Sequence, residues 1–503
     1  MTLVKMLERN ARLTPDKAAI FFHSDRISYS ELDSTANRVA NALIEAGVVR
    51  GDRIGLMLPR VPELIAAFLG IAKANAVAVP INFDLLESGV RAAMSQTSPK
   101  CVIVHKHYLE LARQALPPAA KALIIAVDGD GRVDELSWTE VLRNYSSAGP
   151  SLEINDEDVV YLNYTSGSSG NPKCAITTHS NIYWNTYAAS DALELTSEDI
   201  HICMFAPQAH PHELLARPLY LGGSMVLLET IFPKSLAEAI ASHGVTCMMG
   251  IAPMYEKLLE TVEDRHYDLS SLKIAESGGM HTNTDLIDRF RKKIGVPVLP
   301  VWGSTETTGI AIANRPGEEI VRDSIGRPCP GYEVKLVDEE NREVDTGETG
   351  EMIFRSPAVV KGYFEDRENT NNCFRGGWYY SGDLAKMDDC GNLFFVDRKS
   401  GMMKVTGLKV YPMEIERVLM EHPDIREVAV ISSTDRLRGE VPKAIIVPAN
   451  GKVLSTKEVV DFCREKLPNY KLPRIVEFRE CLPKTGSGKC NKKELHMEEL
   501  SKR

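Results

Sequence analysis

The sequence predicts an α/β protein with a large N-terminal region of layered, mostly parallel sheets and helices, a β-rich part, and a small C-terminal α+β domain. Segments with helical and strand-like hydrophobic spacing alternate over the early chain, which favours parallel sheets covered by helices. From about residue 320, short β-rich segments are punctuated by Gly and Pro. The last hundred or so residues have the pattern of a compact unit with its own helices and strands.

The alternation of helix and strand begins in the first 80 residues. Ser30 and Asp33 have the spacing of a helix capping box, and apolar residues follow at helical spacing until Gly47. The next predicted elements are a strand over 53–58, a helix over 62–74, a buried strand over 76–79 and another over 159–162. Strands that are buried on both faces of a parallel sheet are continuous apolar runs, as the last of these is.

The C-terminal unit is predicted from its own hydrophobic pattern. The expected elements are a helix over 411–420, strands over 427–431 and 443–447, and a helix over 456–467. A unit of this size is large enough to hold its own core. We therefore expect a large domain over 1–397, a short connection over 398–401 and a small domain over 402–503.

Composition excludes several classes of protein. Lys and Arg number 59 against 69 Asp and Glu, so the net charge is −10 over 503 residues, which is not the basic footprint of a nucleic-acid binder. The 10 Cys residues are scattered without zinc-ligand spacing, as in proteins with reduced thiols. The N-terminus has no apolar signal-peptide core, and the apolar stretch 64–81 is interrupted by Lys73 and Asn75. We expect a cytoplasmic protein without a membrane span and without a nucleic-acid partner.

The segment 164–173, with the sequence YTSGSSGNPK, follows a predicted strand and predicts a polyphosphate-binding loop. Its backbone N–H groups and hydroxyls can donate to an anion, and its lysine adds a positive charge. The candidate residues are Thr165, Ser166, Gly167, Ser168, Ser169, Gly170 and Lys173. The segment is not a Walker A loop, because no Gly precedes Lys173. The alternative is an ordinary Ser/Gly surface loop.

A second Gly-Lys pair ends the segment Gly486-Ser-Gly-Lys489 near the C-terminus. It is not a P-loop either, because Pro483 stands at the first Gly position and Cys490 replaces the Ser or Thr that would bind Mg²⁺. Taken alone, this segment favours the alternative that Lys489 is a solvated lysine in a flexible turn.

Five motifs together resemble those of the adenylate-forming superfamily, and most closely its AMP-forming acyl-CoA synthetases. In chain order they are YTSGSSGNPK at 164–173, WGSTE at 302–306, YSGD at 380–383, Asp397-Arg398 with Lys404-Val-Thr-Gly407, and PKTGSGK at 483–489. They are spread over nearly the whole chain and stand in the order the family has. The resemblance implies ATP, Mg²⁺ and coenzyme A as cofactors, and a C-terminal domain that rotates between two half-reactions.

The same resemblance implies a role for each matching residue. The loop 165–173 would bind the β- and γ-phosphates of ATP, and Thr305 would contact the α-phosphate. Glu306 would hold Mg²⁺, an ion that is usually bound by carboxylate and phosphate oxygens. Trp302 would stack on adenine, with a core aromatic as the alternative. Asp383 would bind the ribose hydroxyls with help from Arg398, with a backbone-capping turn residue as the alternative. The remaining nucleotide and cofactor positions are Gly279, Met280, Lys404 and Gly407.

Lys489 would carry the first chemical step. It would stabilise the negative charge that accumulates as a carboxylate attacks the α-phosphorus of ATP to give an acyl-adenylate and pyrophosphate. In the second step a thiol would displace AMP after the C-terminal domain rotates about a hinge at Ser400. The family usually has Asp or Lys at that hinge, so a mechanism that needs a charged hinge residue is in doubt. Cys174 and Asn491 also depart from the family pattern.

The acid is expected to be larger than acetate. His210 resembles a family histidine near the junction of acyl group and thiol, with a structural histidine as the alternative. Dedicated acetate enzymes of the family carry Trp where this chain has Gly303, so here the pocket can continue. Ser277, Gly278 and Gly309 complete the expected pocket, with the last two leaving room. Medium-chain, branched, alicyclic and aromatic acids would all fit, which points to fatty-acid or aromatic-acid metabolism.

The thiol acceptor is expected to be coenzyme A. A second reading is an acyl-AMP ligase that loads a stand-alone carrier protein, and a third is a nucleotide-binding protein without activity. The intact set of Lys173, Glu306, Asp383 and Lys489 argues against the third. A carrier protein and a second copy of the chain in a homodimer are left open as protein partners.

Overall fold

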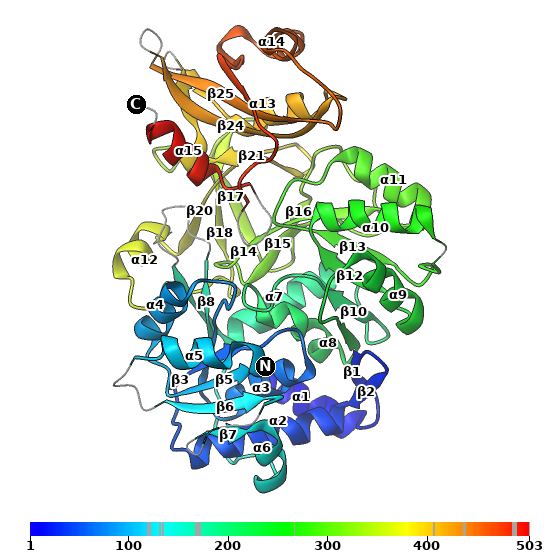
Figure 1. Cartoon of the computed structure of the whole chain (residues 1–503), viewed down its shortest axis with the longest axis vertical. Coiled ribbons are helices and arrows are strands. Elements are labelled where there is room, and N and C mark those ends of the chain that lie inside the picture. Colours follow the sequence, from blue (N-terminus) through cyan, green and yellow to red (C-terminus); the bar gives the residue numbers. More distant parts are fainter. Residues whose placement is uncertain are drawn as a thin grey trace. The chain divides into compact units, whose positions relative to one another are not determined.

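The computed structural model describes residues 1–117, 122–129, 132, 135–165, 173–265, 267–405, 408–435, 439–484 and 490–501. The candidate residues that lie outside the described residues are Ser166, Gly167, Ser168, Ser169, Gly170, Gly407 and Lys489. The chain packs as two compact units (Figure 1). The first comprises Met1–Val334 and Phe354–Tyr379, and the second comprises Lys335–Ile353 and Tyr380–Arg503. The domain boundary expected at 398–401 stays a prediction.

The first unit contains two mainly parallel sheets, which confirms the predicted α/β class. Among its described residues, the seven-stranded sheet runs β7 (Leu136–Ser137), β6 (Leu123–Val127), β5 (Cys101–His105), β3 (Arg53–Met57), β4 (Val77–Pro80), β8 (Val159–Tyr164), β9 (Cys174–Thr178). The nine-stranded sheet runs β16 (Arg327–Pro328), β15 (Gly309–Ala313), β14 (Val298–Ser304), β13 (Ile274–Ser277), β12 (Cys247–Gly250), β10 (Ile200–Cys203), β11 (Ser224–Leu227), β1 (Ala18–Phe22), β2 (Asp25–Ser28).

Helices cover these sheets, and Figure 1 shows α9, α10 and α11 along the nine-stranded sheet. The helices are α1 (Leu3–Leu13), α2 (Tyr29–Glu45), α3 (Pro62–Lys73), α4 (Glu87–Thr97), α5 (Leu109–Ala115), α6 (Trp138–Asn144), α7 (His179–Ala192), α8 (Ala216–Leu221), α9 (Pro233–His243), α10 (Ala252–Asp264), α11 (Thr284–Ile294) and α12 (Arg367–Cys373). Short 3₁₀ turns lie at η1 (Lys106–Tyr108) and η2 (Pro211–Leu214).

The apolar stretch 64–81 becomes core structure. Helix α3 and strand β4 account for it, and nearly all of its side chains are buried. Lys73 interrupts the stretch but is itself buried, with ion pairs to Glu8 at 3.2 Å and Asp33 at 2.9 Å. Among the described residues, no helix combines the length and apolarity needed to cross a membrane.

The predicted start of α2 was wrong by two residues. The capping box is formed by Ser28 and Glu31, not by Ser30 and Asp33: the Ser28 hydroxyl accepts from the Glu31 amide, and the Glu31 carboxylate accepts from the Ser28 amide. Asp33 instead pairs with the buried Lys73. A glutamate reaches back from the third helical position more readily than an aspartate does, which favours the earlier start.

Two further sheets remain, and the strands of the second unit belong to them. One has the order β17 (Glu333–Val337), β18 (Gly350–Arg355), β20 (Trp378–Met387), β19 (Phe374–Arg375), with β21 (Leu393–Arg398) on β20. The other has β23 (Leu408–Val410), β22 (Met403–Val405), β25 (Gly439–Pro448), β24 (Ile425–Asp435), with β26 (Ile475–Phe478) on β25. The helical segments of the second unit are η3 (Lys399–Gly401), α13 (Pro412–Met420), α14 (Thr456–Arg464), η4 (Asn469–Lys471) and α15 (Lys492–Ser501).

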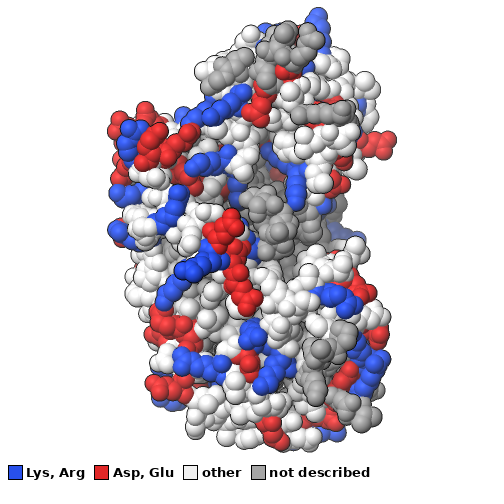
Figure 2. All heavy atoms as spheres, turned by 90° about the vertical axis from the view of Figure 1, so that its left-hand side faces the viewer, with Lys and Arg blue, Asp and Glu red and all other residues white. Residues whose placement is uncertain are grey.

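Acidic and basic side chains are interspersed on the face of the molecule shown in Figure 2. Exposed ion pairs of the chain include Lys106 with Asp128 and Lys361 with Glu157. Exposed pairs of this kind contribute little to stability, because water and salt screen them.

Candidate active site

Several candidate residues of the first unit lie at one edge of the nine-stranded sheet. Strands β10, β12, β13 and β14 are parallel neighbours, so their carboxyl ends share that edge. The segments that leave these ends carry His210 after β10, Gly278 after β13, and Thr305 with Glu306 after β14. Ligands of open α/β sheets bind at the carboxyl ends of the strands, so the position is that of a binding site.

The turn 304–309, which links β14 to β15, holds Thr305 and Glu306. The Thr307 hydroxyl bonds inside the turn, accepting from the Ser304 amide at 2.9 Å and donating to the Gly309 carbonyl at 2.7 Å. The Thr308 amide donates to the Thr305 carbonyl at 3.1 Å. These bonds fix the backbone from which the Glu306 carboxylate projects.

Tyr363 contacts both a proposed phosphate-binding residue and the proposed metal ligand. Its hydroxyl donates to Glu306 Oε1 at 2.6 Å, and Lys173 Nζ lies 5.0 Å from the centre of its ring. Lys173 also lies 3.5 Å from the Cys373 sulfur. Burial, together with the Glu306 carboxylate, raises the pKa of Tyr363 far above its usual value, so its hydroxyl keeps the proton that it donates.

Backbone pairing next to the predicted phosphate loop explains why Tyr363 lies beside Lys173. Strands β8 and β9 are antiparallel, and the Thr165 amide donates to the Lys173 carbonyl at 2.7 Å where the loop leaves them. The segment 362–364 runs along β9 through hydrogen bonds between Ile176 and Gly362 at 3.1 Å and between Phe364 and Cys174 at 2.7 Å. Lys173 and Tyr363 are therefore held side by side by backbone pairing.

Trp302 lies in β14 with one ring face covered. Phe354 stacks on it with ring centres 4.6 Å apart and planes inclined by 3°, and Trp302 is 8% exposed. An adenine ring would therefore have to contact the opposite face or the edge. The adenine role and the alternative of a core aromatic both stay predictions.

The two glycines flanking this turn are constrained by their neighbours. A Cβ on Gly303 would lie 2.3 Å from the Gly309 carbonyl oxygen, and one on Gly309 would lie 2.4 Å from Glu213 Oε1 and 2.8 Å from Asn185 Oδ1. The expectation that Gly309 leaves room is corrected here, because Glu213 and Asn185 fill that space. Gly303 itself is exposed.

The remaining acyl-pocket candidates lie at the carboxyl end of β13 and in the segments that follow β10 and β13. His210 immediately precedes η2, with its ring centre 6.2 Å from that of Phe205. Ser277 is buried and accepts a hydrogen bond from Thr282 at 2.7 Å. A Cβ on Gly278 would meet Val301 Cγ2 at 3.1 Å. Gly279 has φ +78°, a conformation that favours glycine, and is followed by the half-buried Met280.

Two candidates of the second unit, Asp383 and Arg398, lie where β20 and β21 pair. Asp383 lies opposite Arg398, and the Arg398 Nε lies 2.7 Å from Asp383 Oδ1. Glu351 accepts from the Gly382 amide at 3.0 Å and from Lys399 Nζ at 2.7 Å, so it connects the YSGD motif to η3.

The hinge and loop candidates of the second unit are on its surface. Ser400 lies exposed within η3, and Lys404 lies exposed in β22 with its amide donating to Glu440. Neither residue takes part in the hydrogen bonds and ion pairs given for Asp383, Arg398 and Glu351. Their roles stay predictions, as do those of all candidate residues.

The donor set fits a bound Mg²⁺. Among the described residues, no group of three or more His, Cys, Asp or Glu side chains could hold a metal ion alone. Mg²⁺ in nucleotide sites is usually bound by one or two carboxylates together with phosphate oxygens and water. Glu306, which contacts Tyr363 as Lys173 does, supplies a carboxylate of that kind.

Two residues of this site were missed by sequence reasoning. Tyr363 and Phe354 belong to none of the five motifs, and their partners Glu306 and Trp302 lie about 50 residues away along the chain. No local spacing indicates such contacts. Tyr363 is placed by the pairing of 362–364 with β9, and Phe354 lies in β18.

The described geometry agrees with comparisons to known proteins. The model of the family "AMP-binding enzyme" matches residues 7–364, and that of "AMP-binding enzyme C-terminal domain" matches residues 414–489. The chain is 33% identical over 491 residues to a feruloyl-CoA synthase of Amycolatopsis sp, covering 97% of both chains. It is 30% identical to a long-chain-fatty-acid–CoA ligase of Bacillus subtilis, covering 99% of this chain and 94% of the other.

Solved structures agree as well. The anthranilate CoA ligase AuaEII, solved with anthranoyl-AMP, superimposes with a TM-score of 0.91 at 30% identity, covering 100% of this chain and 98% of the other. ATP-bound MatB from Rhodopseudomonas palustris superimposes with a TM-score of 0.90 at 27% identity, covering 99% of both chains. The chain therefore belongs to the AMP-binding, adenylate-forming enzyme family.

Proposed function

We propose that this chain is an AMP-forming acid–CoA ligase acting on a carboxylic acid larger than acetate. The single observation that carries the proposal is the grouping of Lys173, Glu306 and Tyr363 in the first unit. A cation and a carboxylate both contact Tyr363 there, and these are the charges that binding of a metal–polyphosphate requires. Family membership and the acid–CoA ligases among the similar proteins support it.

In the first step, a carboxylate oxygen of the acid attacks the α-phosphorus of ATP, and the bond from that phosphorus to the pyrophosphate oxygen breaks. Lys173 binds the β- and γ-phosphates, Thr305 binds the α-phosphate, and Glu306 holds Mg²⁺. The bound ion would neutralise charge on the phosphate oxygens. Lys489 orients the carboxylate toward the α-phosphate, so the chain contributes position and electrostatic stabilisation without a covalent intermediate.

In the second step, the thiol of coenzyme A loses its proton to solvent and its sulfur attacks the acyl carbon. The bond from that carbon to the phosphate oxygen of AMP breaks, giving a thioester and AMP. Asp383 and Arg398 retain the ribose, and His210 lies at the junction of acyl group and thiol. Gly407 and Lys404 guide the pantetheine chain after rotation about Ser400.

The test is pyrophosphate release by the purified chain with ATP and Mg²⁺ over a panel of acids, each with and without CoA. The panel runs from acetate through butyrate, hexanoate and decanoate to benzoate, cyclohexanecarboxylate and ferulate. We expect turnover that needs both CoA and an acid other than acetate, and its loss in Glu306→Gln. Acid-dependent release that CoA does not stimulate would instead favour a carrier-protein acceptor. Release with acetate alone would contradict the proposed acid class.

A further inference from the structure

We propose that His212 is a positioning residue that holds the turn bearing Thr305 and Glu306 in its binding conformation. The inference rests on the proposed function, because it assumes that these two residues bind Mg²⁺ and ATP. His212 follows the candidate pocket residue His210 by two positions, but it is fully buried and has a different set of contacts.

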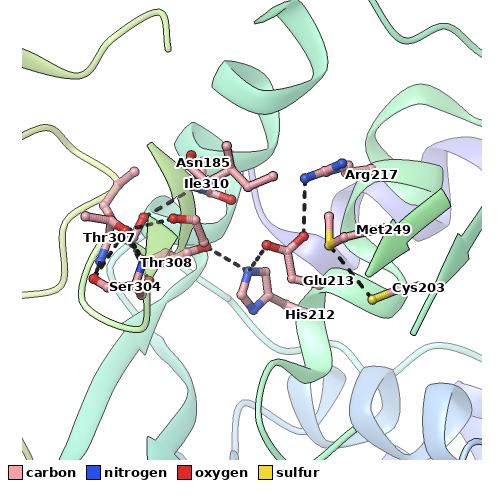
Figure 3. A network of polar contacts seen from close by, with 12 residues as sticks. Asn185, Cys203, His212, Glu213, Arg217, Met249, Ser304, Thr307, Thr308 and Ile310 are labelled. Atoms are coloured by element: carbon pink, nitrogen blue, oxygen red, sulfur yellow. Dashed lines mark hydrogen bonds and ion pairs between the residues drawn. The ribbon is translucent and has the colours of Figure 1, made fainter. Parts of the chain in front are cut away.

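Both ring nitrogens of His212 are engaged. Nε2 lies 2.8 Å from the Thr308 carbonyl oxygen, a contact drawn in Figure 3, and Nδ1 lies 2.7 Å from the Tyr161 hydroxyl. A carbonyl oxygen can only accept, so Nε2 carries the proton and donates it. Nδ1 then accepts from the Tyr161 hydroxyl. One neutral tautomer therefore connects strand β8 of the seven-stranded sheet to the turn after β14.

The backbone of Thr308 has a strained conformation that its neighbours must stabilise. Its φ of +57° lies in the left-handed region, which a β-branched residue rarely adopts. Its carbonyl accepts from His212, its hydroxyl donates to the Ala358 carbonyl at 2.7 Å, and its amide donates to the Thr305 carbonyl at 3.1 Å. Without these bonds Thr308 would relax toward negative φ, and the amide that closes the turn onto Thr305 would rotate away.

Other contacts fix the far side of the same turn. Asn185 Nδ2 donates to the Ile310 carbonyl at 2.9 Å, and the Tyr332 hydroxyl donates to the Thr307 carbonyl at 2.6 Å. These bonds hold residues 307 and 310, and His212 holds the strained residue between them. The contact with His212 is thus placed where the backbone has the greatest tendency to relax.

The charged groups near His212 do not compete for its two bonds. Glu213 Oε1 lies 3.9 Å from Nε2, beyond hydrogen-bond distance. Arg217 donates to the Glu276 carboxylate at 2.7 and 2.9 Å. It also pairs with Glu213 at 3.6 Å, and Figure 3 draws this contact. The imidazole therefore acts as a neutral bridge between a hydroxyl and a carbonyl.

The test compares His212→Phe, which keeps the ring volume, with His212→Gln, whose amide can still donate to Thr308 and accept from Tyr161. We expect His212→Phe to lower the rate of pyrophosphate release roughly 10- to 100-fold, as misplaced groups do. We also expect a several-fold rise in the Mg²⁺ concentration for half-maximal rate, with the acid KM little changed. His212→Gln should recover most of the rate.

A readout independent of activity is amide hydrogen exchange over 304–310. Exchange should be faster in His212→Phe, and it should return toward the wild-type rate in His212→Gln. Adding Thr308→Gly to His212→Phe should also restore much of the activity, because glycine adopts positive φ without needing the hydrogen bond from His212. His201→Phe, which removes another buried histidine of the same unit, is the matched control and should leave exchange over 304–310 unchanged.

The inference is overturned if His212→Phe leaves both the Mg²⁺ requirement and the exchange over 304–310 unchanged. It is also overturned if His212→Gln and the double variant lose as much activity as His212→Phe. Failure of the proposed function looks different, because the wild-type chain would then show no acid-dependent pyrophosphate release and Glu306→Gln would change nothing.

Discussion

Tyr363 is the side chain on which the proposed metal and phosphate contacts depend. Its hydroxyl donates to Glu306 and its ring lies against the ammonium of Lys173. A hydrogen bond to a buried carboxylate fixes the direction in which the other oxygen faces, so one residue orients a carboxylate and a cation that come from different sheets.

Tyr363→Phe should raise the Mg²⁺ concentration for half-maximal pyrophosphate release several-fold and lower the maximal rate about 10-fold. The ring against Lys173 is retained, so the loss comes from the Glu306 carboxylate alone. Initial rates over a Mg²⁺ titration at saturating ATP measure both quantities. An unchanged Mg²⁺ requirement would show that Tyr363 does not orient the metal ligand.

Gly309→Ala should lower the free energy of unfolding by about 2 kcal/mol or more. The new methyl group would meet Glu213 and Asn185 at 2.4 and 2.8 Å, in a residue with φ +117°. Gly295→Ala is the matched control, since it has φ +100° but no atom within 4 Å of its Cβ. Urea denaturation of both variants separates collision from backbone strain, and equal losses would exclude the collision.

The sequence motifs predicted which residues of this site carry the chemistry, but not which residues hold them in position. Thr305, Glu306 and Lys173 stand in recognisable strings. Tyr363 and His212 do not, because their partners are 57 and 96 positions away and are reached only once the sheets have formed. The space at Gly309 was misjudged for the same reason, since Glu213 fills it from another element.

At the scale of elements, helix α2 shows how a local rule can select the wrong register. Ser28 precedes the helix and Ser30 lies in its first turn, and Ser28, which is followed at the right spacing by Glu31, forms the cap. The helix at 62–73 and the strands β3, β4 and β8 were predicted nearly to the residue, because uninterrupted apolar runs leave few alternatives. Helix α14 ends at Arg464, three residues before its predicted end, where the chain turns toward η4.

Ser28→Ala should lower the free energy of unfolding by about 1 kcal/mol, because it removes the acceptor of the Glu31 amide and one partner of the Glu31 carboxylate. Ser30→Ala, which removes a neighbouring hydroxyl that caps no amide here, should cost less. Thermal denaturation of the two variants gives the comparison. A larger loss in Ser30→Ala would contradict the observed cap.

At the scale of the whole molecule, three buried histidines make stability depend on pH. Burial lowers the pKa of His179 to about 4, of His201 to about 3 and of His212 to about 4, against an ordinary value of 6.5. Each is neutral in the folded chain and becomes protonated on unfolding once the pH is below 6.5. The unfolded state therefore binds more protons between about pH 4 and 6.5, and acid favours unfolding there.

We expect the free energy of unfolding to fall by about 2 kcal/mol per buried histidine between pH 7 and pH 5. Urea denaturation at pH 7, 6 and 5 in one buffer measures the slope. His201→Phe should reduce that slope, since one of the three groups is removed. A free energy of unfolding that is flat over this range would show that these histidines are not kept neutral by the fold.

The central claim is that the chain joins an acid to coenzyme A through an adenylate. The most direct test incubates the wild-type chain with ATP, Mg²⁺, CoA and the best acid of the panel, and quantifies AMP, pyrophosphate and acyl-CoA by chromatography and mass spectrometry. We expect the three products in equal amounts, all lost in Glu306→Gln. AMP and pyrophosphate without an acyl-CoA would contradict the claim, and so would ADP and phosphate as the nucleotide products.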